Sequence, residues 1–347
     1  IQDALTAPAE HVAAARGQRG VGWIAGAVAA VLLLALAALS FVHFRETPPA
    51  ERVLSYMIPV PEKSSVNSFA LSPDGRYLAL SVNGNKRQLW LRSLDSMQLQ
   101  ALPGTDDGIS PFWSPDSRWI GFFAQNKLKK VSVSGGPAQT VCDVSAGRSG
   151  SWNSDGVIVF GRNPGLLYRV SAAGGESVPV TKADGASSHR YPVFLPDGRH
   201  FLYLQLGGEP AKAGVHVAAL DGSDDRRLLA DISSAIYVPL RIQSNVGHLL
   251  FLRESALMAQ PFDVGTLQFS GDAFSVAAPV SFGGSVGLAQ VSASANGMLV
   301  YLGGSSFENQ VAWYDRSGRE LRKIGPPGPF AGLALSPDEK TVAIVHR

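Results

Sequence analysis

The chain has 347 residues, of which 45% are hydrophobic, and it contains 37 glycines and 22 prolines. This length allows a large buried core, and the frequent glycines and prolines indicate many turns. The formal net charge of +2 is nearly neutral for this length, which gives no electrostatic footprint for nucleic acid. A single cysteine, Cys142, excludes an internal disulfide framework.

The first predicted element is a membrane-spanning helix at residues 21–44. The stretch contains no Asp, Glu, Lys or Arg and is dominated by Ala, Val and Leu. As a helix it would measure about 36 Å, enough to cross a hydrocarbon layer of about 30 Å, and it is longer than a typical signal-peptide core. Its small residues Gly22, Gly26 and Ala30 share one face, which allows two such helices to pack as a homodimer.

Two linkers flank this helix. Residues 1–20 are predicted to form a juxtamembrane linker, and residues 45–52, which include Pro48 and Pro49, a short and stiff second linker. Arginines lie on both sides of the helix, so the positive charges do not fix its orientation.

From residue 53 to residue 347 the chain repeats one phrase: an apolar run, a turn rich in Ser, Pro, Asp and Gly, and a second apolar run. Phe69–Leu80 is a clear copy. Proline and glycine preset the backbone of a tight turn, so each copy predicts two antiparallel strands. The turns centre on Asp74, Asp116, Asp155, Asp197, Asn245, Asn296 and Asp338.

A period of about 40 residues is typical of propeller blades. Further turns, such as Asp95-Ser96 and Ser134-Gly135-Gly136, add a second hairpin to most copies, which makes four strands per blade. The predicted fold is an all-β propeller at residues 53–347, with six full blades and the start of a seventh. Val53–Val60 is expected to be a strand that completes the last blade. Because the chain opens on Ile1 and stops early in the seventh copy, both ends are expected to continue in the parent protein.

Most of the conspicuous side chains are assigned to structure rather than to chemistry. The Asp of each turn is expected to bond its own backbone, since one acid per blade does not form a catalytic pair. Cys142 is expected in the core. The tryptophans of the repeats are expected to pack between blades. They are Trp90, Trp113, Trp119, Trp152 and Trp313.

The sequence shows no catalytic, metal-binding or cofactor-binding motif that fits its context. Gly283–Gly287 matches the Gly-x-Ser-x-Gly nucleophile elbow, with Asp315 and His346 as nominal partners. The residues that follow keep the blade period and leave no room for the helix that the elbow requires. The kinase motifs are absent, since His189-Arg190 is followed by tyrosine rather than aspartate. The seven histidines show no paired spacing for a metal.

Several segments together resemble a known family. The Ser-Pro-Asp-Gly turns, Leu128–Gly136, Ser188–Leu204 and Leu257–Phe262 are similar to the TolB-like propeller of bacterial membrane-anchored serine/threonine protein kinases. The resemblance covers residues 51–347. It implies a cytoplasmic kinase domain, then a linker, one helix in the inner membrane and an extracytoplasmic propeller. This chain has the last three parts, without the kinase domain, so the resemblance implies a sensor that binds a ligand or partner and signals through one helix.

Two alternatives remain open. Prolyl-oligopeptidase-type peptidases also carry propellers with similar turns, and their hydrolase domain would be expected beyond Arg347. A non-enzymatic TolB-like periplasmic scaffold would bind partner proteins with no enzyme attached.

The binding surface is expected where loops enter the innermost strands, since these loops crowd one face of a propeller around its channel. The repeats place Asp106, Asp107, Arg148, His189 and Arg190 on that face and the Ser-Pro-Asp-Gly turns on the opposite one. Arg148, His189 and Arg190 are the predicted contacts for a protein or small-molecule ligand.

Overall fold

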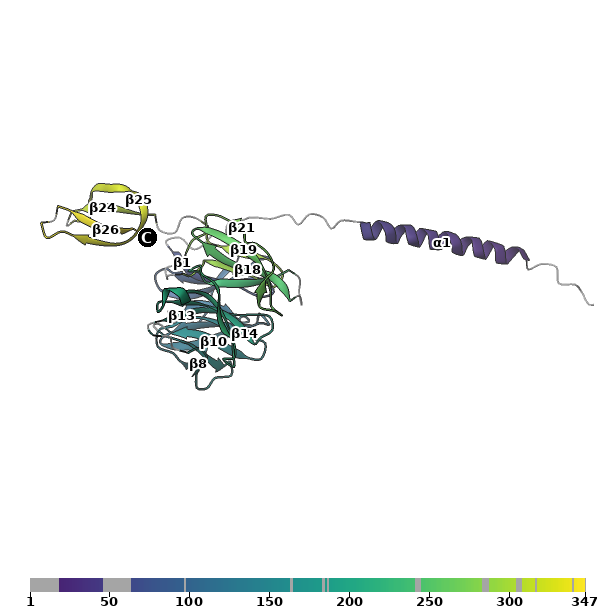
Figure 1. Ribbon diagram of the computed structural model, residues 1–347, viewed down its shortest axis with the longest axis horizontal. Coiled ribbons are helices and arrows are strands. Elements are labelled where there is room, and N and C mark those ends of the chain that lie inside the picture. Colours follow the sequence, from purple (N-terminus) through teal and green to yellow (C-terminus); the bar gives the residue numbers. More distant parts are fainter. Residues whose placement is uncertain are drawn as a thin grey trace, which may run out of the picture. The chain divides into compact units, whose positions relative to one another are not determined.

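The computed structural model describes residues 19–45, 64–96, 98–162, 165–182, 185, 187–240, 245–282, 287–303, 308–315, 317–338 and 340–346. The chain divides into two compact units (Figure 1), Ile1–Pro59 with the helix α1 and Val60–Arg347 with the strands. The predicted strand Val53–Val60 lies outside the described residues.

Helix α1 (Arg19–Arg45) contains the predicted apolar stretch 21–44. Its many alanines and leucines favour a helix, and no proline occurs between Arg19 and Pro48. The described side chains of this helix, such as Trp23 and Leu33, are exposed. Among the residues that the structure describes, no helix combines the length and the apolar character needed to cross a membrane.

Five antiparallel sheets, blades 1 to 5, follow one another along the chain. Blade 1 contains β1 (Ser65–Leu71), β2 (Tyr77–Asn83), β3 (Arg87–Ser93) and β4 (Leu99–Ala101). Blade 2 contains β5 (Ile109–Trp113), β6 (Trp119–Ala124), β7 (Lys127–Ser132) and β8 (Gln139–Asp143). Blade 3 contains β9 (Gly147–Trp152), β10 (Val157–Arg162), β11 (Leu167–Ser171) and β12 (Val178–Pro179).

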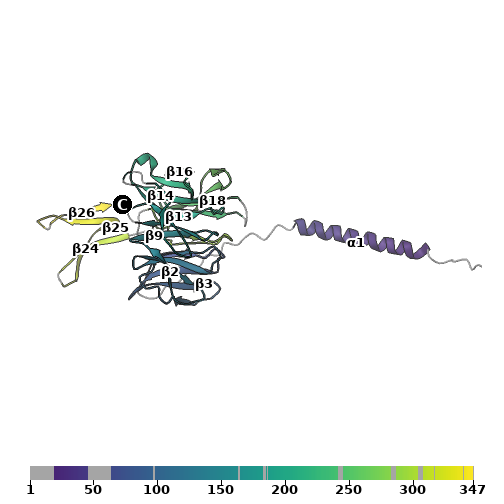
Figure 2. The ribbon, with the colours of Figure 1, turned by 90° about the horizontal axis from the view of Figure 1, so that it is seen from below.

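Blade 4 contains β13 (Ser188–Phe194), β14 (His200–Leu206), β15 (Gly214–Ala219) and β16 (Asp225–Leu229), with a 3₁₀ turn at Pro210–Lys212. Blade 5 contains β17 (Ala235–Pro239), β18 (Val246–Arg253), β19 (Ala256–Asp263), β20 (Gln268–Phe269) and β21 (Phe274–Ala277), which pairs with β19. Figure 2 shows the strand order of blade 4, with β16, β14 and β13 following one another toward β9 of blade 3. The prediction of an all-β propeller of four-stranded sheets is confirmed.

Every predicted turn residue lies between two paired strands, from Asp74 between β1 and β2 to Asp338 between β25 (Glu320–Leu335) and β26 (Val342–His346). The carboxylates bond as turn chemistry requires. Asp74 Oδ1 accepts the Ser72 hydroxyl at 2.6 Å and the Arg76 amide at 3.0 Å. The hydroxyl of Ser114 bonds to Asp116 in the same way and holds the pKa of that carboxyl below its ordinary value. The prediction of a structural role is confirmed for Asp74 and Asp116.

The hydrophobic core lies between the blades. The ring of Phe112 in β5 packs so closely against Gly121 and Gly150 that a Cβ atom on either would come within 2.6 Å of it. Trp113 is buried, and its indole Nε1 donates to the Ala70 carbonyl of blade 1 at 2.9 Å. Cys142 is buried among side chains of blades 2 and 3, and burial raises the pKa of its thiol. Both residues therefore have the core roles that the sequence predicts.

A two-stranded sheet, β22 (Val291–Ala293) and β23 (Leu299–Tyr301), closes the ring between blades 5 and 1. The Leu71 amide of β1 donates to Ser292 Oγ of β22 at 2.9 Å. On the other side, the Ala289 amide donates to Ser234 Oγ at 2.9 Å, just before β17. The first and last parts of the propeller are thus joined by hydrogen bonds.

The remaining strands, β24 (Glu308–Tyr314), β25 and β26, form a three-stranded sheet. The described residues therefore contain five blades, four of them four-stranded and blade 5 with the additional strand β21, and the six full blades of the prediction are not confirmed. The sixth copy of the repeat is the hairpin β22–β23, and the seventh is the hairpin β25–β26.

Candidate binding site on the inner strands

The first strands of blades 1 to 4 are the inner ones, because β1, β5, β9 and β13 contact one another from blade to blade. Each of them carries an irregularity in its pairing with the second strand. In three blades the extra residue has a left-handed backbone, with φ of 50° at Ser110, 28° at Ser149 and 55° at Tyr191. Such conformations are costly for residues other than glycine. Bulges of this kind re-aim side chains and are common next to binding sites.

Serine hydroxyls of one blade hold the bulges of the next. The Ser110 amide donates to Ser68 Oγ of blade 1 at 3.1 Å. The Tyr191 amide of blade 4 donates to Ser149 Oγ of blade 3, also at 3.1 Å, and the Phe194 amide donates to Ser151 Oγ at 2.9 Å. These bonds satisfy amides that the bulges remove from the ladder, and they fix neighbouring inner strands relative to one another.

Arg148 and Arg190 lie on either side of this junction. Arg148 directly precedes Ser149 in β9, and Arg190 directly precedes Tyr191 in β13, so the Ser149–Tyr191 bond brings the two arginines close together. Burial and the charge of Arg190 lower the pKa of Arg148. Each guanidinium has a neutral partner: the Tyr191 side chain bonds to Arg148, and Arg190 Nε donates to Ser188 Oγ at 3.0 Å. Among the described residues, no carboxylate pairs with either arginine.

His189 has a different environment. Its side chain is buried, and its Nδ1 lies 2.8 Å from Thr181 Oγ1 and its Nε2 3.3 Å from Ser187 Oγ. Its ring packs against Tyr203, with 4.9 Å between centroids. The structure thus brings together two of the three predicted contact residues and places the third inside blade 4. The alternation of side chains along a strand could have predicted that His189 and Arg190 differ in this way, because consecutive residues point to opposite faces of a strand.

The predicted acids on this face form local contacts. The carboxylate of Asp106 pairs with Lys86 Nζ at 2.7 Å, and both side chains are exposed. The Asp107 amide donates to the Arg87 carbonyl at 2.8 Å, with a left-handed backbone at Asp107. These contacts tie the loop between β4 and β5 to blade 1.

A partly buried polar network that sequence reasoning missed continues from His189 through blade 4. The Tyr203 hydroxyl donates to Asp225 Oδ1 at 2.7 Å, and His216 Nδ1 lies 3.3 Å from the same oxygen. His216 Nε2 lies 2.7 Å from the Lys212 carbonyl oxygen. Burial would raise the pKa of Asp225, but the bonds from His216 and Tyr203 outweigh it and lower that pKa.

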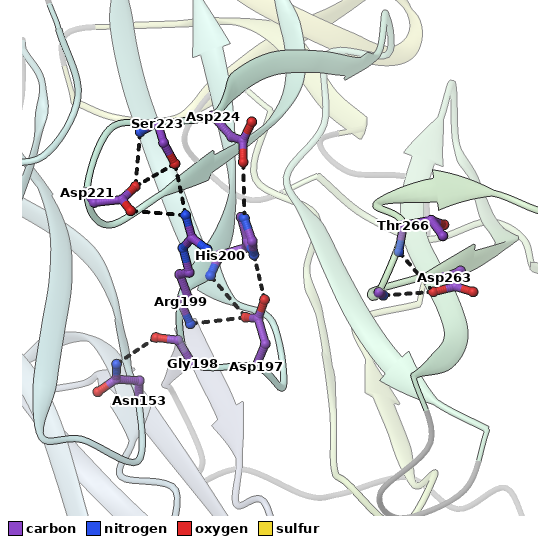
Figure 3. A network of polar contacts seen from close by, with 11 residues as sticks. Asn153, Asp197, Gly198, Arg199, His200, Asp221, Ser223, Asp224, Asp263 and Thr266 are labelled. Carbon is purple, nitrogen blue, oxygen red and sulfur yellow. Dashed lines mark hydrogen bonds and ion pairs between the residues drawn. The ribbon is translucent and has the colours of Figure 1, made fainter.

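The hairpin turns of blade 4 carry a second polar cluster (Figure 3). Arg199 Nη2 lies 3.0 Å from both Asp221 Oδ2 and Ser223 Oγ, and His200 lies between Asp197 and Asp224. Bonds from Ser223 lower the pKa of Asp221 to about 2. Most of these groups are exposed, so the ion pairs add little stability.

The described residues show neither the helix that the nucleophile-like motif requires nor a metal centre. Residues 283–286 of the nucleophile-like motif lie outside them, and the segment from Gly287 to β22 contains no helix. In the part of the chain that is described, no group of three or more His, Cys, Asp or Glu side chains is placed to hold a metal ion.

Comparison with known proteins gives matches of fold only. No protein-family model matches the chain, and no curated protein matches its sequence. Among solved structures, an oligogalacturonate lyase in complex with manganese is 15% identical, with a TM-score of 0.49, over 82% of this chain and 87% of the lyase. TolB from Acinetobacter baumannii is 15% identical, with a TM-score of 0.46, over 59% of this chain and 53% of TolB.

A structure from a study of two prolyl endopeptidases is 13% identical, with a TM-score of 0.45, over 80% of this chain and 46% of the endopeptidase. This chain therefore spans about half the length of that TolB and of that endopeptidase. At these levels of similarity, the propeller assignment rests on the chain's own sheets and on the closure of its ring.

Proposed function

We propose that this chain is the extracytoplasmic sensor part of a bacterial membrane-anchored serine/threonine protein kinase, and that its propeller binds a ligand or partner protein. One observation carries the binding role: Arg148 and Arg190 lie together on bulged inner strands, without a carboxylate partner among the described residues. Bulged strands and unpaired charges are costly to folding and are typical of binding sites. His189 supports the site from inside blade 4 rather than by direct contact.

The proposed anchor is α1, in the inner membrane. It is supported by the absence of Asp, Glu, Lys and Arg from residues 21–44. A ligand would act through this helix by changing the population or the geometry of a homodimer packed along Gly22, Gly26 and Ala30. Such a change requires a ligand that binds one state more tightly than the other.

We also propose that the sixth repeat forms a complete sixth blade, with β24 and the first part of β25 as its outer strands. β24 begins 12 residues after the turn residue Asn296, and the third strands of blades 1, 2, 3 and 5 begin 11 to 13 residues after theirs. Beside β23 lies a cavity of about 200 Å³, lined by apolar side chains such as Phe274 and Leu299. An outer hairpin on β23 would cover these side chains.

Two experiments test the sensor function. Sequencing the reading frame upstream of Ile1 should reveal His-Arg-Asp and Asp-Phe-Gly motifs. Alkaline phosphatase fused after Arg347 should be active in bacteria, because that enzyme requires an extracytoplasmic location. A start codon directly upstream would favour an anchored scaffold instead, and a hydrolase domain downstream would favour the peptidase alternative. A cytoplasmic propeller would contradict the proposal.

A further inference from the structure

The two arginines at the junction of blades 3 and 4 present an unbalanced charge. Arg148 and Arg190 are each half-buried, and their charges repel. Their described partners, Tyr191 and Ser188, provide a phenol and an alcohol rather than a carboxylate. Two like charges in a partly desolvated site raise the free energy of the folded state unless an anion balances them. The site therefore favours a negatively charged group.

The geometry also places both arginines at one junction of inner strands. The Ser149–Tyr191 bond of 3.1 Å joins the two strands directly beside the arginines. A Cβ atom on Gly161 would lie 3.4 Å from both the Arg148 and the His189 carbonyl oxygens, so β9 and β13 approach each other closely at this level. Since Arg190 Nε is held by Ser188, the terminal nitrogens of that guanidinium remain as donors. Two such forks on adjacent strands match the oxygens of one anion.

We propose that Arg148 and Arg190 together bind one oxyanion group, a carboxylate or a phosphate, of the molecule that the propeller senses. The proposal rests on the binding function proposed above and specifies its ligand class. Arginine is suited to this role because its planar fork forms two parallel hydrogen bonds with a carboxylate or phosphate.

The test is anion-dependent thermal stability of the full chain in detergent micelles. Inorganic phosphate and succinate are titrated separately against sodium chloride at constant ionic strength, because a ligand that binds the folded state raises the melting temperature. The variants are Arg148→Gln, Arg190→Gln, the double variant and the charge-conserving Arg148→Lys/Arg190→Lys. Arg118→Gln, which removes an exposed arginine from a turn of blade 2, is the matched control.

The wild type and the control should show a saturable rise in melting temperature with at least one of the anions. The double glutamine variant should bind that anion at least tenfold more weakly, and the lysine variant should be intermediate. Without anion, both single glutamine variants should melt at or above the wild-type temperature, since the repulsion is relieved. A response to phosphate alone or to succinate alone identifies the source of the oxyanion.

Two results would overturn the oxyanion site: no saturable response in the wild type, or equal responses in the wild type and the double variant. The alkaline phosphatase fusion does not depend on these arginines. If the fusion places the propeller outside the cytoplasm and the anion response is absent, the sensor function stands and only its ligand class is wrong.

Discussion

At the scale of single residues, close packing of the blades depends on large aromatic rings that lie against glycines. Phe112 of blade 2 packs against Gly121 of its own blade and Gly150 of blade 3, so its ring occupies space that a Cβ atom would otherwise fill. Phe123 has the same relation to Gly147. Large aromatic rings opposite glycines allow adjacent sheets to approach closely without voids.

The Gly121→Ala substitution should therefore destabilise the propeller. The added methyl group would lie 2.3 Å from the Phe112 ring, and overpacking of this kind typically lowers the free energy of unfolding by about 1–3 kcal/mol. Denaturant unfolding of the full chain measures the change. Gly84→Ala is the control, since the nearest atom to its new methyl group is 3.9 Å away. Equal stability of the two variants would show that the Phe112 ring can move.

At the scale of elements, blade 4 contains a partly buried polar network. Tyr203 on β14, His216 on β15 and Asp225 on β16 are joined by hydrogen bonds across three adjacent strands. The ring of His189 on β13 extends the network by packing at a tilt against the Tyr203 ring. Because Arg190 follows His189 directly, the network fixes the strand that carries half of the proposed oxyanion site.

This network predicts an acid-dependent loss of stability. Because the folded pKa of Asp225 is lowered, its stabilisation is complete above the unfolded pKa of about 3.9 and is lost as the pH falls through the folded pKa. Asp225→Asn should lower the free energy of unfolding by only about 0.5–1 kcal/mol at pH 7, because solvent screens the partly exposed carboxylate. The difference from wild type should shrink in unfolding measurements below about pH 4. Asp224→Asn, whose carboxylate lies 3.5 Å from His200, should have a smaller effect, and a pH-independent difference would contradict the assignment.

How much of this the sequence could predict depends on the range of the interactions. The seven hairpins of the repeated phrase are local, because turn residues such as Asp74 and Asp116 bond to atoms within two residues, and these hairpins were predicted. The bulges were not, because Ser110 and Tyr191 adopt their left-handed backbones beside serine hydroxyls of another blade. The burial of His189 also depends on a distant partner, Tyr203. Composition and period contain no information on such contacts.

The proposed sixth blade can be tested by a disulfide between β23 and β24. In blades 2 and 5, the second and third strands pair in the same register relative to the turn residue of the blade. Applied to the sixth repeat, whose turn residue is Asn296, this register would place Val300 of β23 opposite Val311 of β24. The double variant Val300→Cys/Val311→Cys should therefore crosslink on mild oxidation, while buried Cys142 stays free. The pair Val300→Cys/Ser317→Cys, with its second cysteine in the turn after β24, is the control. Efficient crosslinking of the control pair alone would contradict a sixth blade.

At the scale of the whole molecule, the ring is closed by contacts between residues far apart in the sequence. The Leu71 amide bonds to Ser292, 221 positions later, and Gln290 Nε2 bonds to the Asn67 carbonyl at 3.2 Å. Similar serine–amide bonds join blades 1 and 2 and blades 3 and 4. The closing contacts have the largest loop-closure cost, and contacts of such long range slow folding. Loss of the Leu71–Ser292 bond should therefore open the ring locally, at β1 and β22.

Ser292→Ala tests this closure against a matched internal bond, Ser151→Ala. Each substitution removes one hydroxyl that accepts a backbone amide between neighbouring inner strands, so each should lower the free energy of unfolding by about 1 kcal/mol. Hydrogen exchange should separate them. Exchange should become faster in β1 and β22 for Ser292→Ala and in β9 and β13 for Ser151→Ala, because local opening follows the broken contact. If both variants accelerated the same peptides, the ring would open as one unit, and closure at Ser292 would have no special role.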